Sequence, residues 1–323
     1  MCQPAFAAID IGSNTFRMMI AEHAPSHHPT PWKIVAYTHR IIRLGEGLHQ
    51  SGELGEAAMQ RALQAFREFS ELLQQHHISP QQLHAVATAA MREARNGLAF
   101  CQRVAQETGI HIQVIQGEVE ANLSLAGSCA VLPSPLHNDF LLFDIGGGST
   151  EFVRAKHSKA YDAISCKLGV VRLVEAHLRS DPPSHHDYEA MKQTCQTHLA
   201  AVEAHWLQQH GDSAPPQAMV GTAGTVTTLA AVDLNMGSDQ YDANIINNHC
   251  ITLARFTQLK NRLLNMTLEE RQAIPAIEKG RADLMIAGLA IIESIFERWH
   301  YSTLHVVDAG LLEGAWLKVA SQK

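Results

Sequence analysis

Leu141-Leu142-Phe143-Asp144-Ile145-Gly146-Gly147-Gly148-Ser149-Thr150, in the middle of the chain, nearly repeats Ala7-Ala8-Ile9-Asp10-Ile11-Gly12-Ser13-Asn14-Thr15. Each copy is an apolar run that ends in an aspartate and passes into a turn of glycine and hydroxyl residues. A second β-prone run follows each turn, over residues 16–20 and 152–153. The pattern predicts two strand–turn–strand units of one design, one in each half of the chain.

Both turns are suited to phosphate and metal chemistry. A carboxylate at a strand end beside a glycine turn suits Mg²⁺, so Asp10 and Asp144 are candidate metal ligands. Glycine permits unusual dihedral angles and a close approach, so the turn N–H groups can cradle phosphate oxygens. Tight hairpins that need glycine only for turn geometry are the alternative, but three consecutive glycines exceed that need. The candidate phosphate ligands are Gly12, Ser13, Asn14, Thr15, Gly146, Gly147, Gly148, Ser149 and Thr150.

Bulk composition excludes several classes of protein. At 323 residues the chain exceeds one typical hydrophobic core and suits two domains. Hydrophobic residues make up 46% and charged residues 18%, as in a well-packed globular protein. A net charge of −7 and a pI near 6.3 argue against binding to nucleic acid, which relies on many Lys and Arg residues. An anionic substrate must then be held by local cations, backbone N–H groups or a metal.

Neither disulfides nor a membrane anchor is expected. The cysteines lack C-x-x-C spacing, which argues against a zinc knuckle or a disulfide framework; they are Cys2, Cys101, Cys129, Cys166, Cys195 and Cys250. The sequence does not open like a signal peptide. The longest apolar candidate, residues 284–292, is too short to cross a bilayer. We therefore expect a cytoplasmic protein without a membrane or nucleic-acid partner, and a homodimer is left open.

Strands and helices alternate along both halves of the sequence. Residues 56–75 carry apolar side chains at three- and four-residue steps, which predicts an amphipathic helix. Asn96 can cap a helix that stops at Gly109, and Thr267 with Glu270 forms a capping box. Further strands are predicted over residues 83–88, 110–114, 218–221 and 304–307, and further helices over residues 119–129, 185–208, 226–234 and 281–299. This alternation implies sheets covered by helices on both faces.

Several more segments complete a pattern that runs along essentially the whole chain. They are Ala87-Thr88-Ala89-Ala90-Met91-Arg92-Glu93-Ala94, Gly117-Glu118-Val119-Glu120-Ala121, Gly169-Val170-Val171-Arg172, Gly221-Thr222-Ala223-Gly224-Thr225, Gly280-Arg281-Ala282-Asp283 and Asp308-Ala309-Gly310-Leu311-Leu312-Glu313-Gly314. Together with the two Asp–Gly turns, this ordered set resembles the short form of the exopolyphosphatase/guanosine pentaphosphate phosphohydrolase family, within the acetate kinase/Hsp70/actin superfamily.

The resemblance implies an architecture of two α/β domains of ribonuclease H-like type that face each other across a cleft. Residues 1–130 would form the N-terminal domain and residues 131–323 the C-terminal one, with the last helix packing back on the first domain. Longer members of the family carry an added helical domain that resembles HD phosphohydrolases. The lone pair His186-Asp187, at a helix start, is interpreted as solvated surface rather than as a remnant of that domain.

The resemblance also assigns a catalytic glutamate. When the segment is matched on Ala121, the family's glutamate falls on Glu120. The family usually has adjacent acidic residues here, whereas this chain has Val119, and Glu118 is the weaker contender. On spacing alone, Glu120 would be explained by the favourable interaction of an acid with a helix N-terminus.

Further site residues follow from the same resemblance. Glu151 is placed near the metal, and Arg92 contacts a phosphate through a guanidinium that stays charged. Thr222, Gly224 and Thr225 precede a helix whose N-terminus can attract a phosphate, although a helix cap after a short strand explains them about as well. The weaker candidates are Lys167, Arg172 and Arg281.

The activity implied is Mg²⁺-dependent hydrolysis of the terminal phosphoanhydride of inorganic polyphosphate, with Glu120 activating the water. Guanosine pentaphosphate, cleaved to the tetraphosphate, is the alternative substrate, because phosphate-binding loops see the same end of both molecules. Two other classes stay open. One is an ATP-dependent kinase of the same superfamily, and the other is a polyphosphate- or alarmone-binding sensor without turnover.

Overall fold

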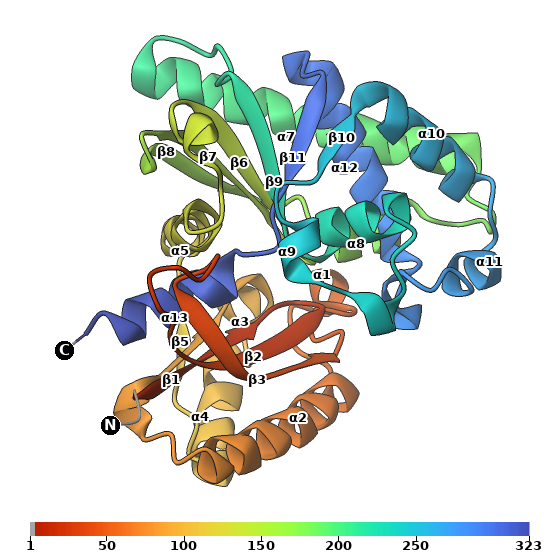
Figure 1. Ribbon diagram of the computed structural model, residues 1–323. Coiled ribbons are helices and arrows are strands. Elements are labelled where there is room, and N and C mark those ends of the chain that lie inside the picture. The colour runs from red at the N-terminus through yellow and green to blue at the C-terminus, as the bar shows by residue number, and fades with distance from the viewer. Residues whose placement is uncertain (1–3, 323) are drawn as a thin grey trace. The chain divides into compact units, whose positions relative to one another are not determined.

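The computed structural model describes residues 4–322, so Cys2 lies outside the described residues. The chain divides into two compact units. The first unit comprises Met1–Val131 and Ala309–Lys323, and the second comprises Leu132–Asp308. Each unit contains one β-sheet with helices packed against it (Figure 1). The five cysteines within the described residues are free thiols.

The first unit is built on a five-stranded sheet of order β3-β2-β1-β4-β5. Its strands are β1 (Ala5–Ile11), β2 (Thr15–His23), β3 (Trp32–Ile41), β4 (Leu83–Ala87) and β5 (Ile112–Val114). The first three strands pair antiparallel, whereas β4 lies parallel to β1 and β5 parallel to β4. The central strand β1 is buried from Ala7 to Ile11, as a continuous apolar run predicts for a strand covered on both faces.

Helices cover both faces of this sheet. They are α1 (Leu48–Ser51), α2 (Glu56–Gln75), α3 (Ala89–Glu93), α4 (Gly97–Thr108), α5 (Gly117–Cys129) and α13 (Leu311–Ala320), with a 3₁₀ turn at Pro80–Gln82. The strand residue Phe16 packs on Phe66 of α2, their ring centroids 5.2 Å apart, and both are fully buried. The opposite face belongs to a second core that includes Met19 and Trp316.

The C-terminal helix α13 belongs to the first unit and packs beside α5 and β1 (Figure 1). Trp316 donates from its indole N–H to the carbonyls of Phe6 and Ala21, at 3.1 and 3.2 Å. Gly127 of α5 and Gly314 of α13 allow the two helices to touch, because a Cβ on Gly314 would lie 1.9 Å from a carbonyl oxygen of α5. Burial of an aromatic anchor and backbone contact therefore fix α13 in place.

The second unit repeats this design. Its sheet has the order β10-β11-β9-β6-β7-β8, formed by β6 (Phe140–Ile145), β7 (Thr150–Lys156), β8 (Lys159–Cys166), β9 (Ala218–Thr222), β10 (Cys250–Thr252) and β11 (Thr303–Val306). Strands β8-β7-β6-β9-β11 match β3-β2-β1-β4-β5 in order and in direction, and β10 adds an antiparallel edge. The repeated sequence motif is thus part of a repeated fold, and both units have the ribonuclease H-like strand arrangement.

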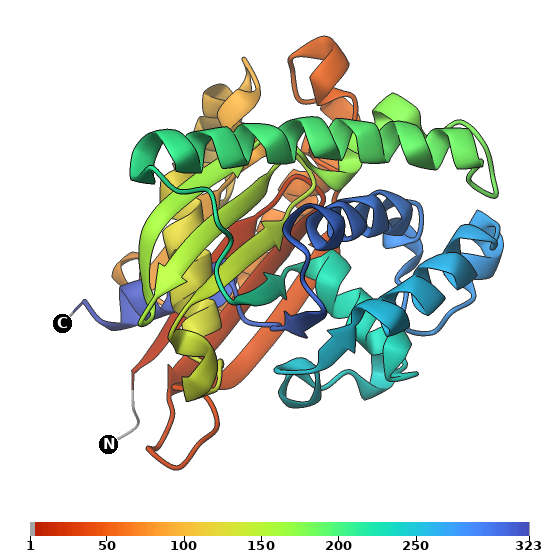
Figure 2. The same cartoon turned by 90° about the horizontal axis from the view of Figure 1, so that it is seen from above.

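Another set of helices packs around the second sheet. They are α6 (Val170–His177), α7 (His185–His210), α8 (Gly224–Asp233), α9 (Ala243–Ile246), α10 (Leu253–Leu264), α11 (Leu268–Gln272) and α12 (Leu284–Trp299), with 3₁₀ turns at Ser134–His137, Ser238–Gln240 and Lys279–Arg281. The long helix α7 runs alongside α12 (Figure 2), where Trp206 stacks on Trp299 with ring centroids 5.0 Å apart. Among residues 4–322, no helix is long and apolar enough to span a membrane.

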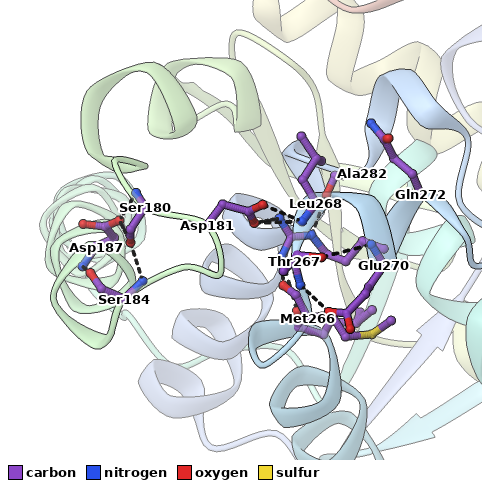
Figure 3. Close-up of polar contacts among 12 residues, drawn as sticks. Ser180, Asp181, Ser184, Asp187, Met266, Thr267, Leu268, Glu270, Gln272 and Ala282 are labelled. Carbon is purple, nitrogen blue, oxygen red and sulfur yellow. Dashed lines mark hydrogen bonds and ion pairs between the residues drawn. The ribbon is translucent and has the colours of Figure 1, made fainter.

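Two aspartates anchor the connection between α6 and α7 (Figure 3). Asp181 accepts the N–H of Leu268 at the start of α11, at 2.8 and 2.9 Å. Asp187 accepts the N–H and hydroxyl of Ser180 and the N–H of Arg179, at 2.7–2.9 Å. Asp187 is buried, so the interpretation of His186-Asp187 as solvated surface is wrong for the aspartate, although His186 is exposed. Its role here is to order a loop.

Most predicted helices are confirmed, with local differences at their ends. Helix α2 has the predicted bounds, and Gly109 ends α4 in the left-handed conformation. Asn96 occupies the N-cap of α4, but its side chain instead accepts the N–H of Leu54 at 2.8 Å. Helix α12 begins at Leu284, later than predicted, because residues 279–281 form a 3₁₀ turn.

Candidate active site

The first turn closes the hairpin between β1 and β2. Gly12 donates its N–H to the carbonyl of Thr15 at 3.1 Å. A Cβ on Gly12 would lie 2.9 Å from that carbonyl oxygen, so a side chain does not fit here. Ser13 and Asn14 at the tip are buried, with 4% and 8% of their surface exposed. The Asn14 amide oxygen is buried and accepts no hydrogen bond within the described part of the chain.

Asp10, the predicted metal ligand of this turn, faces an arginine. Strand pairing places Arg17 directly opposite Asp10, and Arg17 donates to Oδ2 of Asp10 from Nε at 3.0 Å and from Nη2 at 2.6 Å. Burial acts to lower the pKa of Arg17, but the negative charges of Asp10, Glu313 and Tyr37, together with the hydrogen bond to Asp10, outweigh burial and raise that pKa. Arg17 was not among the predicted site residues, although counting outward from the four-residue turn pairs it with Asp10.

The carbonyl groups of the first turn are held by the segment that follows β3. Asn14 accepts the N–H groups of Ile42 and Arg43 at 2.8 and 2.9 Å. Ser13 accepts the N–H of Gly45 at 2.8 Å. The carbonyl side of the turn therefore faces this segment.

The second turn, between β6 and β7, has the same frame. Gly146 donates its N–H to the carbonyl of Ser149 at 2.9 Å, as Gly12 does to Thr15. Its carbonyl groups face the segment that follows β8. The contacts run from Val170 N–H to Gly146 at 3.1 Å, from Val171 N–H to Gly147 at 2.9 Å and from Arg172 Nε to Gly148 at 2.7 Å.

In each turn, therefore, the carbonyl groups point toward that turn's own supporting segment. Within residues 4–322, the N–H groups of Ser13, Asn14, Gly147 and Gly148 have no protein acceptor. Successive N–H groups in a turn form a concave site that favours an anion. Each turn has, on its own, the polarity that phosphate binding requires.

Asp144 lies between two other predicted site residues in the second sheet. Glu151 stands opposite it on β7, and Thr222 stands opposite it on β9. Glu151 is 1% exposed, and its Oε1 accepts the hydroxyl groups of Ser149 at 2.8 Å and Ser165 at 2.6 Å. Two carboxylates on neighbouring strands form a donor set suited to Mg²⁺, which usually takes one or two carboxylates. Among the described residues, no cluster of three or more His, Cys, Asp or Glu residues is arranged to hold a metal.

Thr150 differs from the other turn candidates in its surroundings. It is the first residue of β7, is fully buried and donates its hydroxyl to the carbonyl of Leu168. The Ser149 hydroxyl likewise donates within the protein, to Glu151. The hydroxyl groups of this turn therefore support its frame, while its backbone N–H groups face away from the supporting segment.

Glu120 lies in the first turn of α5 and pairs with Arg92. Arg92 Nη1 donates to Glu120 Oε2 at 3.0 Å and to the carbonyl of Ile115 at 2.8 Å. Glu120 is 6% exposed, whereas Glu118 and Val119 are exposed. The helix N-terminus and the guanidinium both favour a carboxylate at this position. Glu120 is therefore the ordered carboxylate of this segment.

The remaining predicted residues surround the start of α8. Thr222 ends β9, and Ala223 takes a positive φ of 71° before Gly224 begins the helix. A Cβ on Gly224 would lie 1.4 Å from Arg281 Nη1, so this glycine admits the guanidinium to the helix start. Thr225 is buried, and Lys167 is exposed.

The predicted residues thus fall into two sets. Those of the first unit are Asp10, Gly12, Ser13, Asn14, Thr15, Arg92 and Glu120, and those of the second are Asp144, Gly146, Gly147, Gly148, Ser149, Thr150, Glu151, Thr222, Gly224 and Thr225. They lie near the carboxyl ends of β1, β4 and β5 in the first unit, and of β6 and β9 in the second. In the first unit, Thr88 at the end of β4 donates its N–H to Ile11 at 3.2 Å, which joins the turn to the segment that carries Arg92.

The chain is similar to known proteins over nearly its full length. The sequence model of the Ppx/GppA phosphatase family matches residues 19–323. The chain is 32% identical over 324 residues to "Exopolyphosphatase 2" of Mycobacterium tuberculosis, covering 97% of this chain and 98% of that protein. Its fold is similar to the crystal structure of an exopolyphosphatase from Cytophaga hutchinsonii, with TM-score 0.88, 25% identity and 99% coverage of both chains. A family member from Aquifex aeolicus gives TM-score 0.77 and 29% identity, over 98% of this chain and 97% of that one.

Proposed function

The chain belongs to the Ppx/GppA phosphatase family, and from that membership we propose that it cleaves the terminal phosphate from inorganic polyphosphate and releases orthophosphate. As a family member it is a hydrolase of phosphoanhydrides. The names of the Mycobacterium tuberculosis relative and of the Cytophaga hutchinsonii structure favour polyphosphate as the substrate. One observation carries the proposal. In each glycine turn the carbonyl groups are bonded to a neighbouring segment, so the turn N–H groups are available to phosphate oxygens.

The proposed chemistry needs a base and donors for developing charge. Hydrolysis of a phosphoanhydride requires a water molecule, a group that takes its proton, and stabilisation of the transferring phosphoryl group. Glu120 is the proposed base, and the bond from Arg92 fixes the direction of its Oε2. The N–H groups of the two turns would stabilise negative charge on the phosphate oxygens, since they are already oriented before the substrate arrives.

We further propose that Mg²⁺ is held in the second unit by Asp144 and Glu151. Bound Mg²⁺ would neutralise part of the charge on the substrate oxygens. Ser149 and Ser165 support this assignment, because their hydroxyl groups orient the Glu151 carboxylate. Asp10 shares its Oδ2 with Arg17, so we assign the metal to the second unit.

Glu120→Gln tests the proposed reaction. The amide cannot accept the proton of water, so phosphate release from polyphosphate of defined length should fall about a hundredfold or more. Binding of the same polyphosphate, measured by calorimetry, should be retained. Glu118→Gln is the matched control, because Glu118 lies two residues away on the same helix and is exposed. Full activity of the Glu120 variant would exclude Glu120 as the base.

The choice between polyphosphate and guanosine pentaphosphate needs a direct competition. Both substrates offered together, with product analysis, should show preferential turnover of polyphosphate. Preferential turnover of the nucleotide would reassign the substrate within the same family. If the wild-type protein binds both compounds and turns over neither, it is a sensor rather than an enzyme.

A further inference from the structure

The third carbonyl of the second turn is held by a side chain, whereas the first two are held by backbone. Val170 and Val171 donate their N–H groups to Gly146 and Gly147. Gly148 accepts instead from Arg172 Nε, at 2.7 Å. The backbone contacts belong to the fold of α6 and remain whatever the side chains are. Only the contact from Arg172 depends on one residue type.

In the first turn, backbone groups hold the corresponding carbonyl. Asn14 and Gly148 are both the third residue of a four-residue turn closed by the same N–H to carbonyl bond. The Asn14 carbonyl accepts two N–H groups, from Ile42 and Arg43. The side chain of Arg172 thus replaces, in the second unit, what the main chain supplies in the first.

This contact sets the direction of a turn N–H group. The peptide bond is planar and trans, so the carbonyl of Gly148 and the N–H of Ser149 point in opposite directions. Fixing Gly148 O on Arg172 therefore turns the Ser149 N–H away from α6. Within residues 4–322 that N–H has no protein acceptor. Glycine leaves this peptide with wide freedom to rotate, so a donor on its carbonyl is needed to keep one orientation.

From this geometry we infer that Arg172 is a positioning residue, which acts through the Gly148 carbonyl and not through its charge on the substrate. The inference rests on the proposed function, in which the turn N–H groups bind phosphate oxygens. Arg172, a weak candidate on its sequence alone, thus has a defined contact that orients the Ser149 N–H. The hydrogen bond is the required property, and the positive charge is not.

Two substitutions separate the hydrogen bond from the charge. Arg172→Gln places an N–H donor at the same position along the side chain as Nε and removes the charge. Arg172→Lys keeps the charge but places a methylene where Nε stands. We expect kcat/KM for polyphosphate to stay within about twofold of wild type in the glutamine variant. In the lysine variant it should fall about tenfold, because that variant loses one hydrogen bond.

Arg179 provides the matched control. It follows the other end of α6, and its guanidinium also donates to backbone carbonyls, those of Glu175 and Ala176. Arg179→Gln and Arg179→Lys should both leave kcat/KM unchanged. Loss of activity in the lysine variant of Arg172 alone would then report on the turn and not on the stability of α6, which thermal unfolding of all four variants measures.

Each outcome decides the inference. If Arg172→Lys is more active than Arg172→Gln, the charge acts and the inference is wrong; if both variants match wild type, the contact has no role and it is also wrong. If wild-type protein releases no phosphate, the proposed hydrolysis fails separately. In that case the inference is tested by the affinity for tripolyphosphate, measured by calorimetry. Affinity should fall about tenfold in the lysine variant and not in the glutamine variant, and equal affinities would overturn it.

Discussion

The residue opposite the turn aspartate is Arg17 in the first unit and Glu151 in the second. The two turns otherwise share their length, their closing hydrogen bond and the direction of their carbonyl groups. In the first, the guanidinium neutralises Asp10 within the protein. In the second, Asp144 and Glu151 bring two carboxylates to neighbouring strands. The same fold thus carries opposite electrostatics at equivalent positions.

This difference implies two ways of binding a phosphate chain. A turn with its own cation can attract an anion without any added ion. A turn flanked by two carboxylates repels an anion unless a metal lies between them. By their sequence pattern alone, Asp10 and Asp144 are predicted to share one role, as metal ligands. The strand register instead favours Arg17 as the built-in cation of the first unit and Mg²⁺ as the added cation of the second.

The largest expected effect is on the dependence of activity on Mg²⁺. It tests directly whether the two turns differ in their cation. Glu151→Gln should raise the Mg²⁺ concentration for half-maximal phosphate release by tenfold to a hundredfold, because one carboxylate of the proposed pair is lost. Arg17→Gln should leave that concentration unchanged, even if it slows the reaction. Glu189→Gln, on the exposed surface of α7, serves as the control. If the Glu151 variant and the wild type needed the same Mg²⁺ concentration, the assignment of Mg²⁺ to the second turn would be wrong.

The segments that support the two turns differ in how closely they approach. A Cβ on Gly169 would lie 2.3 Å from the carbonyl oxygen of Gly147, whereas one on Gly45 would lie 3.1 Å from the Ser13 Cβ. Gly169→Ala must displace either α6 or the turn, so we expect a loss of about 3 kcal/mol in unfolding free energy, together with most of the activity. Gly45→Ala should cost about 1 kcal/mol or less. Urea unfolding and phosphate release measure both, and a tolerated Gly169 variant would mean that α6 does not hold the turn.

The Asp10–Arg17 pair can be tested for stability by a double-mutant cycle. Arg17→Gln leaves a mostly buried carboxylate without its main cation, and we expect a loss of about 2 kcal/mol in unfolding free energy. Adding Asp10→Asn to that variant should recover about half of the loss, because an uncharged pair needs no cation. Independent, additive effects would show that the two side chains are not coupled, and the built-in cation of the first turn would have to be sought elsewhere.

Much of this architecture can be predicted from the sequence, because the signals for its turns, helices and helix ends lie in neighbouring residues. The repeated Asp–Gly motif predicted two related hairpins, and each is formed by two adjacent strands in the interior of its sheet. The periodicity of residues 56–75 predicted α2 with its observed bounds. Gly109 predicted a helix end because a left-handed residue was needed there. In each case, neighbouring residues carry the whole signal.

The features that the sequence does not predict depend on pairing between distant segments. The third strands β3 and β8 were not predicted, since β3 exposes Ile34 and Val35 at a sheet edge and its pairing shifts by one residue there. Arg17 was missed because its role comes from strand register. The hydrogen bonds from residues 42–45 to the first turn, and from residues 170–172 to the second, connect segments that no local pattern links.

The smallest expected effect concerns Asp187, which orders the connection that follows α6. Helix α6 in turn supports the second turn. Burial acts to raise the pKa of Asp187, but hydrogen bonds from Ser180, Arg179 and Ser184 outweigh it and lower that pKa to about 2. Because the folded-state pKa lies below the ordinary value of 3.8, the ionised carboxylate stabilises the fold fully above about pH 4, and this contribution is lost as the pH falls toward 2. Asp187→Asn should therefore cost about 1 kcal/mol near neutral pH, a value reduced for screening because the connection borders solvent. In urea unfolding across this range, the difference between variant and wild type should shrink as the pH falls from about 4 to about 2. A difference that stays constant would mean that Asp187 orders the connection by its shape and not by its charge.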